Sequence, residues 1–204
     1  MSKQLPEIDP DLATWIAAQK IFFVGTAPSS PNAHINISPK GGDSFRILGP
    51  MEVVYQDYTG SGAETAAHLQ ENGRIIVMFC AFDGPPQIVR LHGRGTAIIE
   101  THPRFAEFSK QFPPNPGTRA FVHIHVTRVS SSCGYSVPFF DFVGTRDTLE
   151  KWATKQGSKK LREYRAKKNK LSIDGLPALS ETGSSAKSAA SNGQSGVVSR
   201  QLES

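Results

Sequence analysis

The feature that most constrains the fold is a series of short segments rich in β-branched and aromatic residues, separated by glycine and proline. Such segments favour β-strands, and the breakers between them favour turns. The sequence predicts six strands, at residues 21–27, 34–38, 51–57, 75–82, 88–100 and 120–129. Strands joined mostly by short turns indicate a closed antiparallel barrel rather than a parallel sheet.

Helical patterns interrupt and follow this series. Asp9 and Pro10 give a cap and an early proline to a short helix at residues 11–20. Further helices are predicted at residues 63–71 and 101–112, each packed across an opening of the barrel, with Thr101 as the cap of the second. Two more begin at Thr145 and run to Asn169, separated near Gly157. The predicted class is mainly β with peripheral helices.

The chain divides by composition into a folded part and a tail. Residues 1–178 are expected to form one domain that includes the C-terminal helices at about 145–170. Residues 179–204 consist largely of Ser, Gly, Ala and Asn, and we expect them to be disordered because they cannot bury enough apolar surface.

Several features of the sequence indicate the cellular compartment of the protein. The sequence has no run of eighteen apolar residues and no signal-peptide pattern, so neither a membrane span nor secretion is expected. Cys80 and Cys133 are its only cysteines, which gives no disulfide framework and fits a reducing compartment. We expect a cytoplasmic protein, with the nucleus as the alternative.

Positive charge is concentrated in one segment. Residues 151–170 hold nine Lys or Arg and a single acid, Glu163, so the segment carries +8 of a chain whose total is +5. Such a helix could attract an acidic partner or nucleic acid, or it could be a solvated surface helix. We favour the solvated helix and expect no nucleic-acid binding, because no aromatic or glycine-rich binding motif accompanies the charge.

The stretch from Tyr58 to Thr65 is a candidate phosphate site. It joins a strand to a helix, Gly60 and Gly62 allow close approach of the backbone, and Thr59, Ser61 and Thr65 offer hydroxyls. The same residues could form an ordinary turn with Ser61 as the helix cap. The stretch matches neither a Walker loop nor a dinucleotide-binding motif. Upstream, Lys40 could supply a cation to the same phosphate or could be a surface lysine.

Histidine and cysteine give weaker signals. His123 and His125 share one face of a strand, but two histidines and Cys133 are poor evidence for a metal, and no metal site is predicted. His92 is most simply a partly buried strand residue. A nucleophilic Cys133 would need a base. We therefore favour a role for Ser132–Pro138 in lining the ring of a bound ligand or in forming an interface.

Several stretches together resemble the pyridoxamine 5'-phosphate oxidase-like family, whose members have an FMN-binding split β-barrel. The resemblance extends in order over about residues 10–178 and rests on these stretches: 33–41, 45–50, 58–65, 78–82, 90–95, 132–135 and 172–177. It implies a six-stranded antiparallel split barrel, a homodimer with FMN at the subunit interface, and an oxidoreductase that passes a hydride between flavin N5 and a small-molecule substrate.

The resemblance also implies the residues that line the flavin. Ser38 and Lys40 would lie along the ring and ribityl side. The ribityl and phosphate would be met by residues of one loop: Tyr58, Thr59, Ser61, Gly62 and Thr65. Asp57 fits only if its carboxylate is turned away from the phosphate. No catalytic residue is implied.

The chain departs from true pyridoxamine phosphate oxidases at two places. The loop reads Gly-Ala-Glu-Thr instead of carrying an arginine-lysine pair, and the end reads Ser-Ile-Asp-Gly-Leu-Pro instead of a Trp- and Arg-rich segment. Vitamin B6 oxidation is therefore not expected. The alternatives are a split-barrel deazaflavin or haem binder, with His92, His123 or His125 as haem ligands, and a flavin-binding or interaction protein without turnover.

Overall fold

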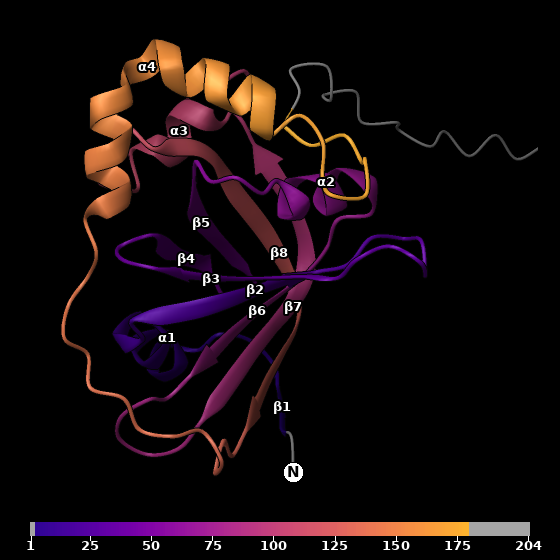
Figure 1. The fold of residues 1–204 in the computed structure, drawn as a ribbon. Coiled ribbons are helices and arrows are strands. Elements are labelled where there is room, and N and C mark those ends of the chain that lie inside the picture. Colours follow the sequence, from indigo (N-terminus) through magenta and orange to yellow (C-terminus); the bar gives the residue numbers. More distant parts are fainter. Residues whose placement is uncertain (1–2, 180–204) are drawn as a thin grey trace, which may run out of the picture.

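The structure is a computed structural model and describes residues 3–179 of the 204-residue chain. Its elements, coloured along the chain in Figure 1, are β1 (Lys3–Leu5), α1 (Pro10–Ala18), β2 (Ile21–Thr26), β3 (Asn36–Gly41), β4 (Phe45–Gly49), β5 (Glu52–Tyr58), α2 (Glu64–Glu71), β6 (Arg74–Cys80), β7 (Ile88–Ile98), α3 (Phe105–Ser109), β8 (Thr118–Ser132) and α4 (Thr148–Lys168). Apart from Leu179, the predicted disordered tail lies outside the described residues.

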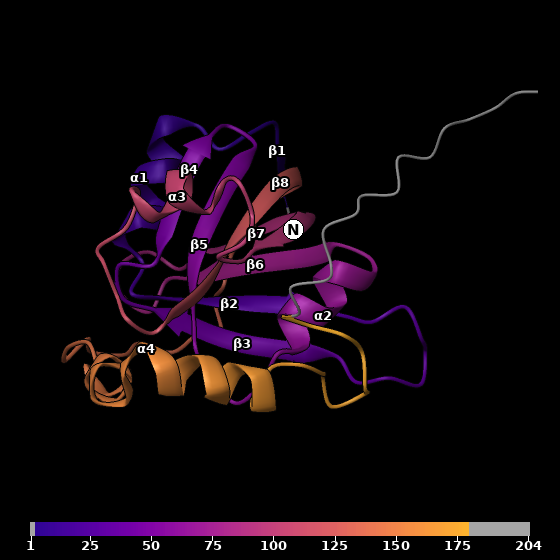
Figure 2. The same ribbon diagram turned by 90° about the horizontal axis from the view of Figure 1, so that it is seen from above.

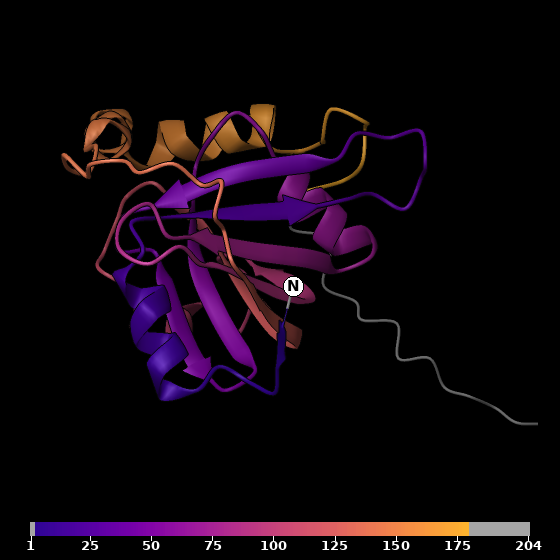
Figure 3. The same cartoon turned by 90° about the horizontal axis from the view of Figure 1, so that it is seen from below.

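One antiparallel sheet contains every strand within residues 3–179. Its order is β3-β2-β6-β7-β8-β5-β4, and β1 pairs with β8 as an additional branch. The long β8 therefore pairs with three strands, β1, β5 and β7. The sheet curls into a half-barrel, as the three ribbon views show (Figures 1, 2 and 3). The predicted class, mainly β and antiparallel with a few helices, is confirmed.

Two details of the predicted barrel are wrong. The sheet has eight strands rather than six, because β1 and β4 were not expected. Within residues 3–179 no ladder joins the end strands β3 and β4, so the barrel is not closed by pairing. The short strand β4 lies between two pairs of turn-forming residues, Gly41–Gly42 and Gly49–Pro50. Because these residues favour turns, the edge strand between them was not predicted.

The concave side of the sheet holds the main core. Strand β2 shows why its sequence forms this surface, since alternate residues such as Phe22 and Val24 are buried while their neighbours are half-buried. Phe22 meets Phe45, Tyr55 and Phe79 with ring centroids 5.1–5.7 Å apart. These aromatic contacts join strands from both ends of the sheet order and stabilise its curvature.

The helices cover the sheet at its ends. Asp9 caps α1 as predicted, since its Oδ1 accepts a hydrogen bond from Leu12 N at 2.8 Å. Helix α2 packs on β2, β6 and β7, and α3 packs on β8. Helix α3 is much shorter than predicted, and Thr101 does not cap it, because the residue before its first turn is Arg104.

Helix α4 consists of two helical pieces, as predicted. They meet at Gly157, whose φ of 68° and ψ of 165° are open only to glycine. The helix runs past the end of the sheet at which α2 and α3 lie (Figures 1 and 2). No helix within residues 3–179 is long and apolar enough to span a membrane.

Candidate functional site

The loop between β5 and α2 leads into a helix whose N-terminus has no side-chain cap. Helix α2 begins at Glu64, and the residue at its N-cap position is Ala63, whose side chain can make no capping bond. Ser61 is therefore not the cap that the sequence analysis considered, and its side chain is exposed. The first N–H groups of a helix lack intrahelical acceptors and attract anions. This end of α2 can thus accept a negatively charged group.

Two guanidinium groups and an amide hold the inner side of the loop. Arg119 Nη1 donates to Gly62 O at 2.8 Å, and Asn169 Nδ2 donates to Gly60 O at 2.9 Å. Arg165 Nε donates to Thr59 Oγ1 at 2.8 Å, and its Nη2 donates to Thr118 O at 2.9 Å. Sequence reasoning did not single out these three side chains as site residues, because they lie 57 to 109 positions from their partners in the loop.

Thr59 is part of this inner framework. Its N–H and its hydroxyl both donate to Gly117 O, at 2.7 and 2.9 Å, and the residue is only 1% exposed. The hydroxyl that was expected to meet a ligand is therefore already engaged on both its donor and acceptor sides. Thr59 anchors the loop to the start of β8.

Asp57 connects the loop to the edge of the sheet. Its carboxylate is buried, with Lys40 Nζ 2.6 Å from Oδ1 and Arg119 Nε 2.8 Å from Oδ2. Burial alone would raise the pKa of Asp57, but attraction to Lys40 and Arg119 and the hydrogen bonds from both hold that pKa below its ordinary value. The carboxylate is turned toward these cations, and the charge of Lys40 is shared with it.

A polar network links Ser38 to Thr65. Asn36 is its centre: Nδ2 donates to Thr65 Oγ1 at 3.0 Å and to Thr26 Oγ1 at 3.3 Å, while Oδ1 accepts from Ser38 Oγ at 3.2 Å. Thr26 Oγ1 also lies 3.0 Å from Nδ1 of the buried His68. Strand β3 and helix α2 are thus joined beside the loop, and two of the predicted site residues lie in one network.

Tyr58 lies at the end of β5, and its side chain reaches back along the strand. Its hydroxyl donates to Gln56 Oε1 at 3.0 Å, and burial raises its pKa, with Asp43 and Glu150 adding to the effect and Arg46 opposing it. The hydroxyl is therefore committed to the strand end. Tyr58 fixes the start of the loop rather than adding a free donor to it.

The residues around the loop can be tested for their fit to the phosphate of FMN. The uncapped end of α2, the exposed Ser61 and two nearby guanidinium groups suit a dianion. A side chain at Gly60 would meet nothing within 4 Å, so its surface is open. Glu64 opposes this fit, because an oxygen of its carboxylate lies in hard contact with the position that a Cβ on Gly62 would take. The donor set fits a phosphate, provided that this one carboxylate is displaced.

The segment after α4 lies against the same region. Asp174 accepts hydrogen bonds from His34 N at 2.9 Å and from His34 Nδ1 at 2.7 Å. Ala178 packs with the buried Ala63 at the N-cap position of α2 and with Ala67 inside the helix. The segment at residues 171–178 therefore borders both the β2–β3 connection and α2.

A separate cavity of about 420 Å³ lies beside Arg165, between α3, the loop at 113–116 and α4.

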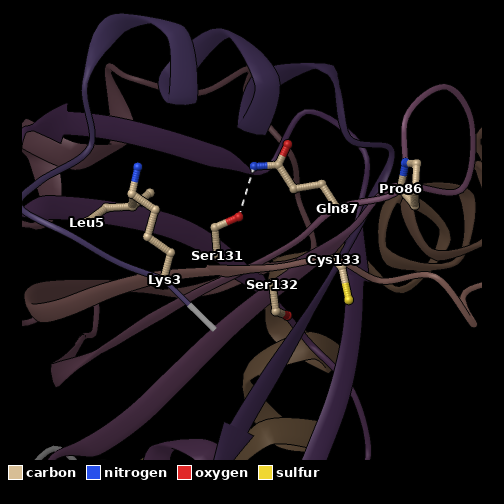
Figure 4. A pocket seen from close by; sticks show the side chains of 7 residues that line it. All are labelled: Lys3, Leu5, Pro86, Gln87, Ser131, Ser132 and Cys133. Carbon is tan, nitrogen blue, oxygen red and sulfur yellow. Dashed lines mark hydrogen bonds between the residues drawn. The ribbon is translucent and has the colours of Figure 1, made fainter. Parts of the chain in front are cut away.

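The remaining candidate residues do not form a site. His123 Nε2 lies 2.5 Å from Glu52 Oε1, His125 is exposed, and His92 is half-buried. Within residues 3–179 no three His, Cys, Asp or Glu residues are placed to hold a metal ion. Figure 4 shows the surroundings of the exposed Cys133, in a hollow of about 410 Å³ whose lining residues include no histidine and no carboxylate.

The chain is similar to several solved structures at low sequence identity. A streptococcal HupZ (Group A Streptococcus) aligns over 66% of this chain and 99% of its own, with 20% identity and a TM-score of 0.49. A putative pyridoxamine 5'-phosphate oxidase from Lactobacillus delbrueckii aligns over 62% and 98%, with 13% identity and a TM-score of 0.48. An FMN-binding protein from Syntrophomonas wolfei aligns over 58% and 82%, with 17% identity and a TM-score of 0.44.

Sequence comparisons are more specific. The family model described as pyridoxamine 5'-phosphate oxidase matches residues 8–133, more than half of the chain. A curated relative, the pyridoxamine 5'-phosphate oxidase family protein ustO of Aspergillus flavus, is 38% identical over 191 residues, which cover 84% of this chain and 76% of the relative. The residues that the family model matches include the loop and its supporting Arg119. Because the model matches more than half of the chain and the curated relative is 38% identical to it, the chain belongs to the pyridoxamine 5'-phosphate oxidase family.

Proposed function

We propose that this protein is an FMN-dependent oxidoreductase that acts on a small molecule. The observation that carries the proposal is the uncapped N-terminus of α2 with the polar loop before it, flanked by Arg119 and Arg165, in a chain of this family. When bound, FMN would accept or donate a hydride at its N5, which is chemistry that no side chain supplies.

The residues of this chain would bind and orient the cofactor. Ser61, Thr65 and the free N–H groups before α2 would hold the phosphate, with Gly62 allowing the backbone to approach. Ser38 and Lys40 would lie along the ring and ribityl side, as the family resemblance implies. Because Lys40 is paired with Asp57, it would bring less net positive charge to the ring than a free lysine.

Oxidation of pyridoxamine phosphate itself is not proposed. The loop offers Glu64 where true oxidases carry part of an arginine-lysine pair, and the C-terminal segment ends in Leu176-Pro177-Ala178 against α2. The proposed substrate is therefore a different small molecule, which binds without an arginine-lysine pair in the loop and without a Trp- and Arg-rich C-terminal segment.

We also propose that the protein is a homodimer with the flavin at the subunit interface. The outer edge of β3 is unpaired among the described residues, and Ile35 and Ile37 beside it are 75% and 71% exposed. Ile173, 70% exposed, is brought near them by the bond between His34 and Asp174. An exposed apolar surface of this kind is typical of an interface. Sedimentation velocity should show twice the monomer mass, and Ile37→Glu should restore the monomer.

Absorption and mass spectrometry of the purified protein test the function. The protein should be yellow, and the released ligand should have the mass of FMN. A colourless protein that takes up no added FMN would overturn the proposal, and a Soret band would replace it with haem binding.

A double variant then tests the site. Ser61→Ala combined with Thr65→Ala should weaken FMN binding, because the two changes remove one hydroxyl group just before α2 and one in its first turn. Thr14→Ala combined with Thr154→Ala is the matched control, since both threonines are exposed and lie on other helices. Equal FMN affinity in the two double variants would show that the loop is only a turn.

A further inference from the structure

Helix α4 covers a cavity whose lining residues, apart from Arg165, are not among those proposed to hold the flavin. The cavity lies between α4, α3, the loop at residues 113–116 and the neighbouring ends of β5 and β8, and its volume is about 420 Å³. Small-molecule sites commonly measure roughly 300–1,000 Å³. Of the residues in α4 only Ala153 and Leu161 are buried, so the helix packs loosely and leaves this space open.

One side of the cavity is apolar and rigid. Phe105 of α3 and Phe121 of β8 both line it, with ring centroids 5.0 Å apart. The three prolines of residues 113–116 continue this wall, and their rings restrict the backbone. A flat apolar molecule would bury surface against such a wall, which is favourable.

The polar groups at the strand ends are already paired. Gln56 Nε2 donates to Thr118 Oγ1 at 2.7 Å, and Thr118 Oγ1 donates to Asn115 O at 2.8 Å. Tyr58 donates to the remaining oxygen of the Gln56 amide at 3.0 Å. These groups therefore complete the wall of the cavity and offer a ligand few further hydrogen bonds.

The side of the cavity formed by α4 is positively charged. Ser158, Leu161, Arg162 and Arg165 all line it, and their spacing places them on one face of the helix. The exposed guanidinium of Arg162 makes no hydrogen bond or ion pair within residues 3–179. Arg165 donates from Nε to Thr59 and from Nη2 to Thr118, so Nη1 stays available among the described residues.

Glu100 is the single acid in the described lining of the cavity. Burial lowers the pKa of Arg165, and attraction to Glu100 opposes this effect. A guanidinium remains charged at neutral pH. Two arginines therefore face one carboxylate, and no ion pair joins Glu100 to either arginine in the described part of the chain. The balance of charge favours an anion.

We propose that this cavity binds a small carboxylic acid with a flat apolar body. Arg162 and Nη1 of Arg165 hold the carboxylate, because a planar guanidinium can form two parallel hydrogen bonds with it. Phe105 and the prolines of residues 113–116 pack against the apolar body. The proposal concerns a second site and does not depend on the proposed flavin chemistry.

The experiment uses three probes that separate charge from shape. 2-Naphthoate carries both the carboxylate and the rings, 2-naphthamide lacks the charge, and acetate lacks the rings. Each probe is titrated by calorimetry into the full chain as purified and into four variants. Arg162→Met removes a cation of the cavity, and Lys160→Met removes an exposed cation from another face of the same helix. Ser158→Phe fills the cavity at constant charge, and Glu100→Gln removes the opposing carboxylate.

The expected result depends on both parts of the probe. 2-Naphthoate should bind at least about tenfold more tightly than 2-naphthamide or acetate. Arg162→Met should weaken 2-naphthoate binding about three- to tenfold, and Glu100→Gln should strengthen it about two- to fivefold. Ser158→Phe should abolish saturable binding, and Lys160→Met should match the wild type.

The opposite outcomes would overturn the proposal. If Ser158→Phe binds 2-naphthoate as the wild type does, the probe lies elsewhere. If Lys160→Met weakens binding as much as Arg162→Met, the helix attracts anions without a defined site. Failure of the wild type to bind 2-naphthoate would also refute the proposal.

The two proposals can fail separately. A protein that binds 2-naphthoate in this pattern but takes up no FMN would lose the proposed function and keep the second site. Should Ser158→Phe not fold, Arg162→Met and Lys160→Met still decide the question, because both side chains are exposed.

Discussion

Asp57→Asn should strongly destabilise the protein, because Asp57 is the one carboxylate shared by Lys40 and Arg119. Both cations lie within 2.8 Å of its oxygens, and the side chain of Arg119 is only 7% exposed. An asparagine can still accept one hydrogen bond, but it leaves the buried guanidinium without a counter-charge. Breaking a buried ion pair in this way costs about 3–5 kcal/mol. That is a large share of the roughly 5–15 kcal/mol that stabilises a typical domain.

The net stabilisation by the ion pairs of Asp57 is far smaller than the Coulomb attraction between the charges. At an effective dielectric constant of about 20, two unit charges about 4 Å apart attract by about 4 kcal/mol, and Asp57 has two such partners. Desolvation of the buried ions opposes this attraction by several kcal/mol per ion. Lys40→Met should therefore cost less than Asp57→Asn, since Lys40 is more exposed and Arg119 still neutralises the carboxylate.

Urea unfolding followed by tryptophan fluorescence measures these differences. Asp43→Asn is the matched control, because Asp43 pairs with Arg46 at the surface and such pairs contribute at most about 1 kcal/mol. The folded-state pKa of Asp57 is depressed, so its stabilisation is present above the unfolded value of about 4 and is lost as pH falls through the lower folded value. The wild type and Asp57→Asn should therefore converge in acid. A cost below about 1 kcal/mol at pH 7 would refute this reasoning, since a buried pair should cost several times more.

Three further substitutions test the fold. Phe22→Ala should lower the free energy of unfolding in urea by about 3–5 kcal/mol, because it empties the centre of the aromatic core; a cost near that of a surface change would contradict this assignment. Gly93→Ala should cost about 1–3 kcal/mol in thermal unfolding, since a Cβ there would overlap the carbonyl of His125 at the irregularity between β7 and β8, and an unchanged midpoint would count against that register. Gly157→Ala should cost about 1–3 kcal/mol through its backbone angles, seen as a loss of Trp152 ordering by fluorescence; an unaltered spectrum would argue for a continuous helix.

The sequence predicted the local part of the fold well. The alternation of Phe22 and Val24 with less apolar neighbours placed β2 within one residue, and Asp9 with Pro10 placed the start of α1. The kink at Gly157 was also expected. These features depend on interactions between residues close together in the chain, which sequence patterns record directly.

The missed features depend on distant partners. The three-residue strand β1 is a strand only because β8 lies beside it, and no local pattern marks Lys3–Leu5 as extended. At the candidate site, Tyr58–Thr65 was found from its glycines and hydroxyls. Arg165 and Asn169 were not, because in sequence they are members of a basic helix, and only the tertiary structure brings them to the loop.

Strand β8 also sets the order in which the protein can assemble during synthesis. It is the last of the described strands to be made, and among the described residues it provides the only strand pairing between the β3-β2-β6-β7 group and the β5-β4 group. Lys3 pairs with Ser131, so at roughly 5–20 residues per second the first strand waits on the order of ten seconds for its partner. During that interval the nascent chain exposes apolar strand edges. A pause in translation after residue 132 would therefore favour folding more than a pause before residue 118.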